Sequence, residues 1–77
     1  MSDLSVQHYL GIYETRLGMI EKGITHPTPQ VVAGVRRLVA ALRELNPEEK
    51  IHLDSTDERA IFTKVSTGDL VAQIDFR

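Results

Sequence analysis

The chain has 77 residues, of which 42% are hydrophobic and 26% charged, which suits one small globular domain spanning residues 1–77. Nine basic and eleven acidic side chains give a net charge of −2, which argues against a dedicated nucleic-acid binder. The chain contains no cysteine, which excludes disulfides, thiolate metal sites and a cysteine nucleophile.

The chain carries no sign of export or membrane insertion. No apolar run reaches the length of a membrane span, and the N-terminal MSDLS lacks the pattern of a signal peptide. We therefore expect a cytoplasmic protein that does not contact a membrane. Small domains without disulfides or metals often gain burial by oligomerising, which makes a homodimer our expectation.

Residues 3–22 are predicted to form the first helix, because apolar residues recur there every three or four positions. The stripe comprises Val6, Leu10, Tyr13, Leu17, Ile20 and Ile24. Ser2, Asp3 and Ser5 are candidate N-caps. Gly23 suits the left-handed conformation that commonly ends a helix.

A second helix is predicted over residues 29–45. Thr28 followed by Pro29 is a typical helix start, and Pro47 ends the pattern. The apolar stripe of this helix comprises Val31, Val35, Leu38, Leu42 and Leu45, widened by Val32 and Val39. Because the connection is short, the two helices are expected to form an antiparallel hairpin over residues 3–45.

From residue 50 onward the apolar period changes to that of β-strands. We predict strands over residues 51–53, 60–65 and 70–76, with Gly68 in the last turn. The expected fold class is α+β, with the N-terminal antiparallel helical hairpin packed on a C-terminal three-stranded antiparallel β-meander over residues 50–76 (α-α-β-β-β). In the last strand we expect Leu70, Ala72, Ile74 and Phe76 to face the core.

The segment TGDLVAQI, residues 67–74, resembles the closing hairpin of FlaG-type flagellar proteins. The likeness covers about a tenth of the chain and ends where that family continues into Ile-Pro, because Asp75 and Phe76 follow here. No family is assigned on this segment.

Catalytic motifs are missing from the sequence. It contains no glycine-rich phosphate loop, no nucleophile elbow and no histidine pair at a metal-binding spacing. His52 and Asp54 share one strand face and are the best candidates for an orienting pair in a small enzyme or ligand binder. We expect a non-enzymatic protein without a cofactor or a metal.

Three arginines on the second helix, Arg36, Arg37 and Arg43, are the candidate nucleic-acid contacts. Residues 1–45 carry five basic and four acidic side chains, whereas residues 46–77 carry four basic and seven acidic. Phosphate binding benefits from clustered cations, and this segregation is weak. A nucleic-acid-binding regulator is therefore the alternative function rather than the leading one.

The first helix carries a second set of residues away from its main stripe. Ile12 and Met19 are seven residues apart and project roughly 180° from that stripe, at about 100° per residue. Gly11, Thr15 and Gly18 lie between the two apolar sides. Each glycine costs a helix about 1 kcal/mol, which a closely approaching partner backbone would offset. Alternatively, the glycines only let the second helix pack closely, and the two large residues are scattered exposed apolars.

A second candidate surface is the outer face of the sheet. If the register holds, it carries Phe62, Val71 and Gln73, with Lys64 and Asp75, and the last strand is an edge able to pair with a partner strand. We predict a small protein-protein interaction module, a bacterial or phage regulator or inhibitor, that docks on a partner protein or on itself. The expected partner-binding residues are Ile12, Thr15, Met19, Phe62, Val71 and Gln73.

Overall fold

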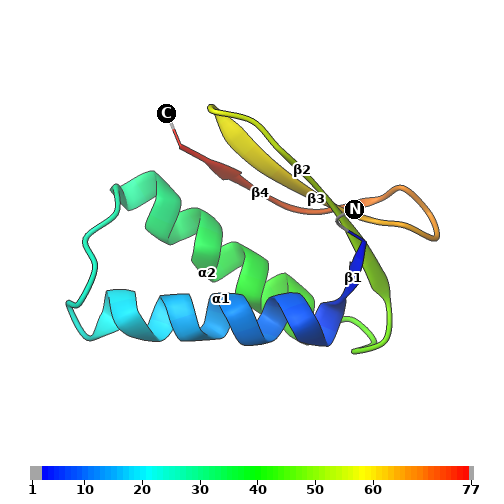
Figure 1. Ribbon diagram of the computed structural model, residues 1–77, viewed down its shortest axis with the longest axis horizontal. Helices are drawn as coiled ribbons and strands as arrows, with labels where there is room; N and C mark the ends of the chain where they lie inside the picture. The colour runs from blue at the N-terminus through cyan, green and yellow to red at the C-terminus, as the bar shows by residue number, and fades with distance from the viewer. Residues whose placement is uncertain (1–2, 77) are drawn as a thin grey trace.

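A computed structural model describes residues 3–76 of the chain. In chain order the elements are β1 (Leu4–Ser5), α1 (Val6–Glu21), α2 (Pro29–Arg43), β2 (Lys50–Ser55), β3 (Arg59–Lys64) and β4 (Leu70–Asp75). The helices form one layer and an antiparallel sheet of order β1-β2-β3-β4 forms the other (Figure 1). The α+β class and the helical hairpin packed on an antiparallel sheet are thus confirmed, and the sheet has four strands where three were predicted.

The additional strand, β1, consists of two residues immediately before α1. Leu4 lies opposite Ile51 and Ser5 lies opposite Lys50 of β2. The Ser5 side chain also caps α1 by accepting a hydrogen bond from the His8 backbone N–H at 3.4 Å. The chain therefore passes from the edge strand directly into the helix without a loop. The sequence did not predict β1 because two residues are too few to show an alternating pattern.

The predicted helix signals are confirmed in part. α1 runs from Val6 to Glu21 rather than over residues 3–22, because Leu4 and Ser5 form β1 and Ser5 is the cap; the candidate cap Ser2 lies outside the described residues. Thr28 caps α2 through its side chain, Pro29 is the first helical residue, and Gly23 has a φ of 76° after α1. The end of α2 is at Arg43 rather than residue 45. The next two residues donate backbone hydrogen bonds to carbonyls three residues back, which tightens the last turn beyond α-helical geometry.

The core lies between α2 and the sheet and is mainly aliphatic, with Tyr9 and Phe62 as its aromatic residues. Its buried residues are Val6, Tyr9, Val35, Leu38, Val39, Leu42, Ile51, Ala60, Phe62, Ala72 and Ile74. The predicted stripe of α2 supplies four of them. α2 lies close to β4 at Gly34, where a Cβ would lie 3.1 Å from the Cα and side chain of Ile74. Glycine at this position lets the helix lie directly on the strand.

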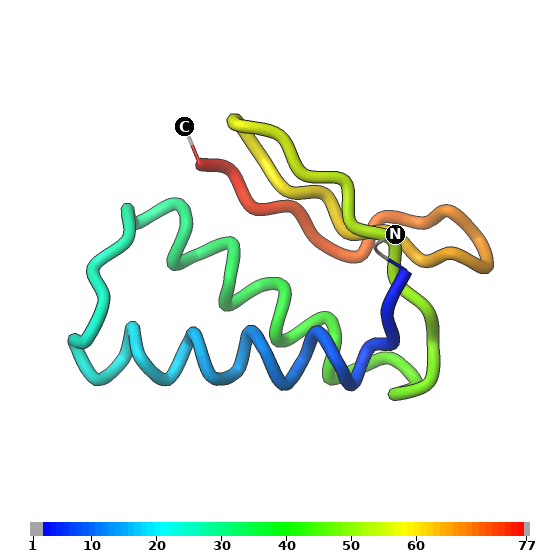
Figure 2. The backbone as a smooth tube through the Cα atoms, viewed as in Figure 1, coloured from blue at the N-terminus to red at the C-terminus, as the bar shows by residue number. Residues whose placement is uncertain are grey.

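α1 is the outer helix and buries much less of its surface. Only Val6 and Tyr9 are fully buried, whereas Leu10 and Leu17 are half-buried against the core. Figure 2 shows α1 and α2 close together at one end and diverging toward the loop that joins them. The predicted stripe is wrong at its end: Ile24 is 63% exposed, because it follows the left-handed turn that leads the chain away from the core.

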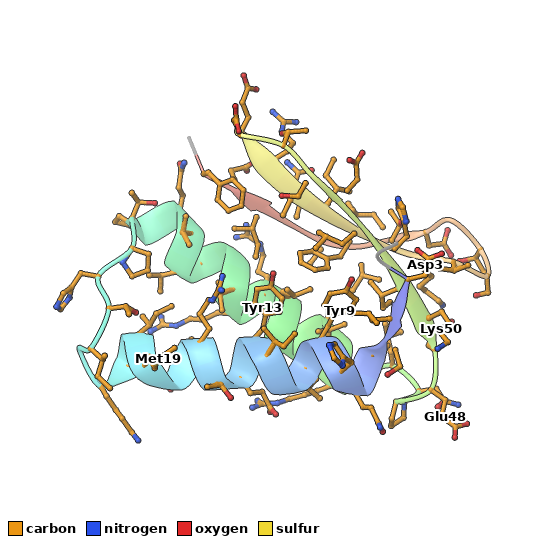
Figure 3. The ribbon with its side chains drawn as sticks, in the orientation of Figure 1. Asp3, Tyr9, Tyr13, Met19, Glu48 and Lys50 are labelled. Carbon is orange, nitrogen blue, oxygen red and sulfur yellow. The ribbon has the colours of Figure 1, made fainter. Side chains whose placement is uncertain are left out.

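Two tyrosines connect α1 to the sheet. The rings of Tyr9 and Tyr13 meet the ring of Phe62 edge-on, with centroids 5.7 and 5.5 Å away. In Figure 3 both side chains extend from α1 toward the sheet. This edge-to-face arrangement is favourable for aromatic rings, and it adds to the aliphatic contacts that hold α1 against the rest of the fold.

The expected place of Phe62 on the outer sheet face is corrected, because its side chain is 0% exposed. Ala60, Ile61 and Phe62 are consecutive apolar residues, so the alternation of side chains along the strand does not show whether Phe62 or Ile61 faces the core. Pairing of Phe62 with Leu53 and with Ala72 places it on the inner face.

The expected alternation along β4 is corrected at its first two residues. Phe62 lies opposite Ala72, but the next β3 residue, Thr63, lies opposite Leu70. β4 therefore carries one extra residue, Val71, in a bulge. Val71 is half-buried against the core, and Leu70 is 61% exposed instead of facing inward. Phe76, also expected to face the core, follows the end of β4 and is exposed.

The two tyrosines make stability sensitive to alkaline pH. Burial, followed by the charges of Tyr13 and Asp3, raises the pKa of Tyr9 above its ordinary value. Burial also raises the pKa of Tyr13, against an opposing effect of Arg16. A raised pKa means that the folded state favours the neutral phenol over the phenolate. The stability that depends on the neutral phenols is therefore fully present below the unfolded pKa of about 10, and it decreases as the pH rises further.

We therefore expect the free energy of unfolding, measured by urea denaturation, to decrease between about pH 9 and about pH 11. In Tyr9→Phe this decrease should be smaller, since one of the two phenols no longer ionises. An identical alkaline loss of stability in wild type, in Tyr9→Phe and in Tyr13→Phe would show that other groups cause it.

Candidate functional site

Five residues of α1 form the leading candidate surface, which we call the α1 face: Gly11, Ile12, Thr15, Gly18 and Met19. Helical geometry turns this set away from Val6 and Leu10, which point toward the core. Gly11, Ile12 and Thr15 are exposed, and Ile12 keeps 42% of its surface in solvent. Gly18 and Met19 are half-buried.

The two glycines of the α1 face lie in open space. A Cβ added to Gly11 or to Gly18 would meet no atom within 4 Å. Close packing against α2 therefore does not explain these glycines, and that role belongs to Gly34. Each is still expected to cost the helix about 1 kcal/mol relative to alanine. Packing within the chain gives no compensation for this cost.

Beside the α1 face, a groove opens between the diverging ends of the helices. Its volume is about 320 Å³. We call it the hairpin groove and define it by its lining residues, Arg16, Met19, Ile20, Thr25, Pro27 and Val31. Met19, labelled in Figure 3, belongs to both surfaces. The guanidinium carbon of Arg16 lies 5.3 Å from the ring centroid of Tyr13, which holds this arginine beside the groove.

An ion pair between the helices changes the predicted arginine cluster. Arg43 donates through Nε at 3.1 Å and through Nη2 at 2.8 Å to the same carboxylate oxygen of Glu14. Both side chains are largely exposed, so the pair adds little stability. It does occupy Arg43, which leaves Arg36 and Arg37 as the exposed arginines of α2 without an ion pair among the described residues.

The outer sheet face is mainly polar. Gln73 is half-buried and donates a hydrogen bond through Nε2 to the Asp75 carboxylate at 2.8 Å. Arg59 lies 3.9 Å from the same oxygen. Phe62 and Val71, which the sequence placed on this face, turn inward instead. Ile61, opposite Asp54 and Gln73, is an apolar residue on this face and is half-buried among polar neighbours. Of the two candidate surfaces, the α1 face is therefore the more apolar.

The candidate orienting pair of His52 with Asp54 is not formed. His52 Nδ1 lies 2.9 Å from an oxygen of Asp3, and both side chains are about half-exposed. This contact connects the segment before β1 to β2, at the opposite end of α1 from the hairpin groove. Neither His52 nor Asp54 lines that groove.

Three general findings complete the description. No family model, curated protein or solved structure matches the chain. Within residues 3–76, none of the helices is both long and apolar enough to cross a bilayer. In the same residues no three His, Asp or Glu side chains are grouped so that they could hold a metal ion.

Sequence reasoning missed the hairpin groove. Its residues come from α1, the connecting loop and the start of α2, and no motif joins them. The only related signal is the pair of prolines at Pro27 and Pro29, which restrict the path of the loop.

Proposed function

We propose that the chain is a small non-enzymatic interaction module, a regulator or inhibitor of bacterial or phage type, that docks on a protein partner through the α1 face. The partner is a second copy of the chain or another protein. The observation that carries the proposal is that Gly11 and Gly18 lie in open space next to the exposed side chain of Ile12.

The proposed docking follows from the shape and polarity of α1. A helix face that stays in water normally carries charged side chains. The α1 face has none, and its glycines allow another backbone to approach closely. The exposed residues at its ends, His8 and Lys22, would contribute polar contacts at the rim. Burial of Ile12 in the centre would supply the apolar contribution to binding.

Changing Ile12→Asp should abolish association while leaving the free energy of unfolding within about 0.5 kcal/mol of wild type, because the side chain makes little contact with the core. Sedimentation equilibrium measures self-association, and affinity capture from the source cells measures binding to another protein. Leu70→Asp is the matched control, since Leu70 is equally apolar, 61% exposed and on β4.

Gly11→Ala and Gly18→Ala provide the second arm of this test. Each should stabilise the isolated chain by up to about 1 kcal/mol and at the same time weaken association, because the added methyl occupies the space a partner needs. A wild-type chain that is monomeric and captures no protein contradicts the proposal. So does association that survives Ile12→Asp.

The alternative function, a nucleic-acid-binding regulator, is favoured by one observation. Residues 22–43 contain no Asp or Glu, and Arg36 and Arg37 are exposed within this stretch. Binding through phosphates would weaken steeply with salt. A mobility shift of DNA or RNA at low salt that disappears in the Arg36→Gln/Arg37→Gln double variant would favour this alternative over the α1 face.

A further inference from the structure

We propose that the hairpin groove binds a small molecule with an apolar body and a single carboxylate. The body lies on the carbon surface between the two helices, and the carboxylate pairs with Arg16 at the mouth. This site is separate from docking on the α1 face and shares with it only Met19.

The groove has the size and lining of a small ligand site. Its volume of about 320 Å³ is at the lower end of the range for such sites. Met19, Ile20, Pro27 and Val31 supply apolar surface, and only Arg16 and Thr25 among the lining residues have polar side-chain atoms. A small number of polar groups in an apolar groove fix the orientation of a bound ligand.

The groove is built into the fold at both of its ends. Gly23 turns the chain out of α1 with a φ of 76°, and the Ile24 backbone N–H bonds to the Met19 carbonyl at 2.9 Å. On the other side Thr28 caps α2, and Pro27 and Pro29 stiffen the loop between these points. The helices are therefore held apart at this end before any ligand arrives, so a ligand need not open the groove.

The positive charge of Arg16 favours a ligand that carries a carboxylate. Arg16 has no carboxylate within ion-pair distance among residues 3–76, whereas Arg43, Arg59 and Lys64 each have one. The loop and α2, which form the far wall, lie within residues 22–43, where no acidic residue occurs. An anion entering the groove meets Arg16 and no competing negative charge on the opposite wall. A cation of the same shape would be repelled by the same arginine.

Octanoate is the probe for this site, titrated into the uniformly ¹⁵N-labelled chain and followed by amide chemical shifts. We expect saturable shifts centred on Met19, Ile20 and Val31, with a dissociation constant on the order of 1 mM for so small a ligand. Octyltrimethylammonium has the same chain with the opposite charge, and it should bind at least about fivefold more weakly. Octanol tests the apolar contribution alone.

Two exposed lining residues allow variants that leave the core intact. Arg16→Gln should weaken octanoate about fivefold and leave octanol within about twofold. Thr25→Phe places a ring in the groove and should abolish binding of both. Arg37→Gln, which removes an exposed arginine outside the groove, is the matched control and should leave octanoate binding unchanged. Thermal unfolding confirms that each variant is folded.

Several outcomes would overturn the site. One is that the amide chemical shifts of the groove residues do not change at tens of millimolar octanoate. Another is that octyltrimethylammonium binds as tightly as octanoate. A third is that the Arg16→Gln variant binds octanoate as well as wild type does. Groove shifts that depend on protein concentration instead would assign the groove to a second copy of the chain. Ile12→Asp should retain octanoate binding, so failure of the docking proposal and failure of this site are distinguishable.

Discussion

Replacing Phe62 by alanine is expected to lower the free energy of unfolding by about 3–5 kcal/mol. Phe62 has one of the largest fully buried side chains of the described residues. Its ring projects from β3 into the core between the sheet and the helices. Removing it leaves a cavity that the surrounding side chains fill only in part. The change is measured by urea denaturation followed by far-ultraviolet circular dichroism.

The loss has a second source in the contacts of Phe62 with α1. Tyr9 and Tyr13 each meet its ring edge-on, and such aromatic pairs contribute about 0.5–1.5 kcal/mol beyond their burial. A small domain has a total stability of about 5–15 kcal/mol, and a chain of this size belongs near the lower limit. Phe62→Ala should therefore be partly unfolded at room temperature.

Phe76→Ala is the matched control, because the same side chain is 39% exposed there. It should cost less than about 1 kcal/mol. Phe62→Leu, which retains an apolar side chain but loses both ring contacts, should fall between the two. A loss below about 1.5 kcal/mol for Phe62→Ala would contradict a core centred on this ring.

The sequence predicts α2 far better than α1, for a reason visible in their residues. α2 has apolar residues on one side and Arg36, Arg37 and Ala40 on the other, so its buried face follows from its pattern. α1 has apolar residues around most of its circumference, including Tyr9 and Ile12. The predicted stripe of α1 left out Tyr9, which is buried, and included Ile24, which is exposed, because contact with the rest of the fold decides which of these residues are covered.

The β-sheet shows the same limit of local patterns. The hairpin turn at Gly68 is local, and its φ of 76° agrees with the prediction. The sheet face on which Phe62 lies, and the bulge at Val71, depend on how three strands align. The residues of one strand do not specify that alignment. The two-residue strand β1 exists only because β2 lies beside it.

Some features of the candidate surfaces were likewise predictable from the sequence, and others were not. The exposure of Ile12 was predictable from helical spacing, because the core-facing stripe leaves that position outside. The ion pair of Arg43 with Glu14, 29 residues apart, was not predictable, since its partner lies on the other helix. The hairpin groove also depends on the path of a loop, which sequence periodicity does not describe.

Changing Gly34→Val is expected to lower the free energy of unfolding by about 3 kcal/mol. A Cβ at this position would lie 3.1 Å from the backbone and side chain of Ile74, and valine adds two further methyl groups. Backbone atoms of a paired strand cannot move aside as a flexible side chain can, so α2 must lift from β4. The small gain in helix propensity over glycine, a few tenths of a kcal/mol, does not offset that displacement.

Gly18→Val is the matched control, because it makes the same change in α1 where no atom lies within 4 Å of an added Cβ. It should change stability by no more than about 0.5 kcal/mol. Both are measured by urea denaturation of the isolated chain at low concentration. If both variants lose the same stability, the cost comes from valine in a helix and not from contact with β4. If only Gly34→Val is destabilised, Gly34 is required by the fold. Gly18 then has no packing role within the chain, which is the result that the docking proposal requires.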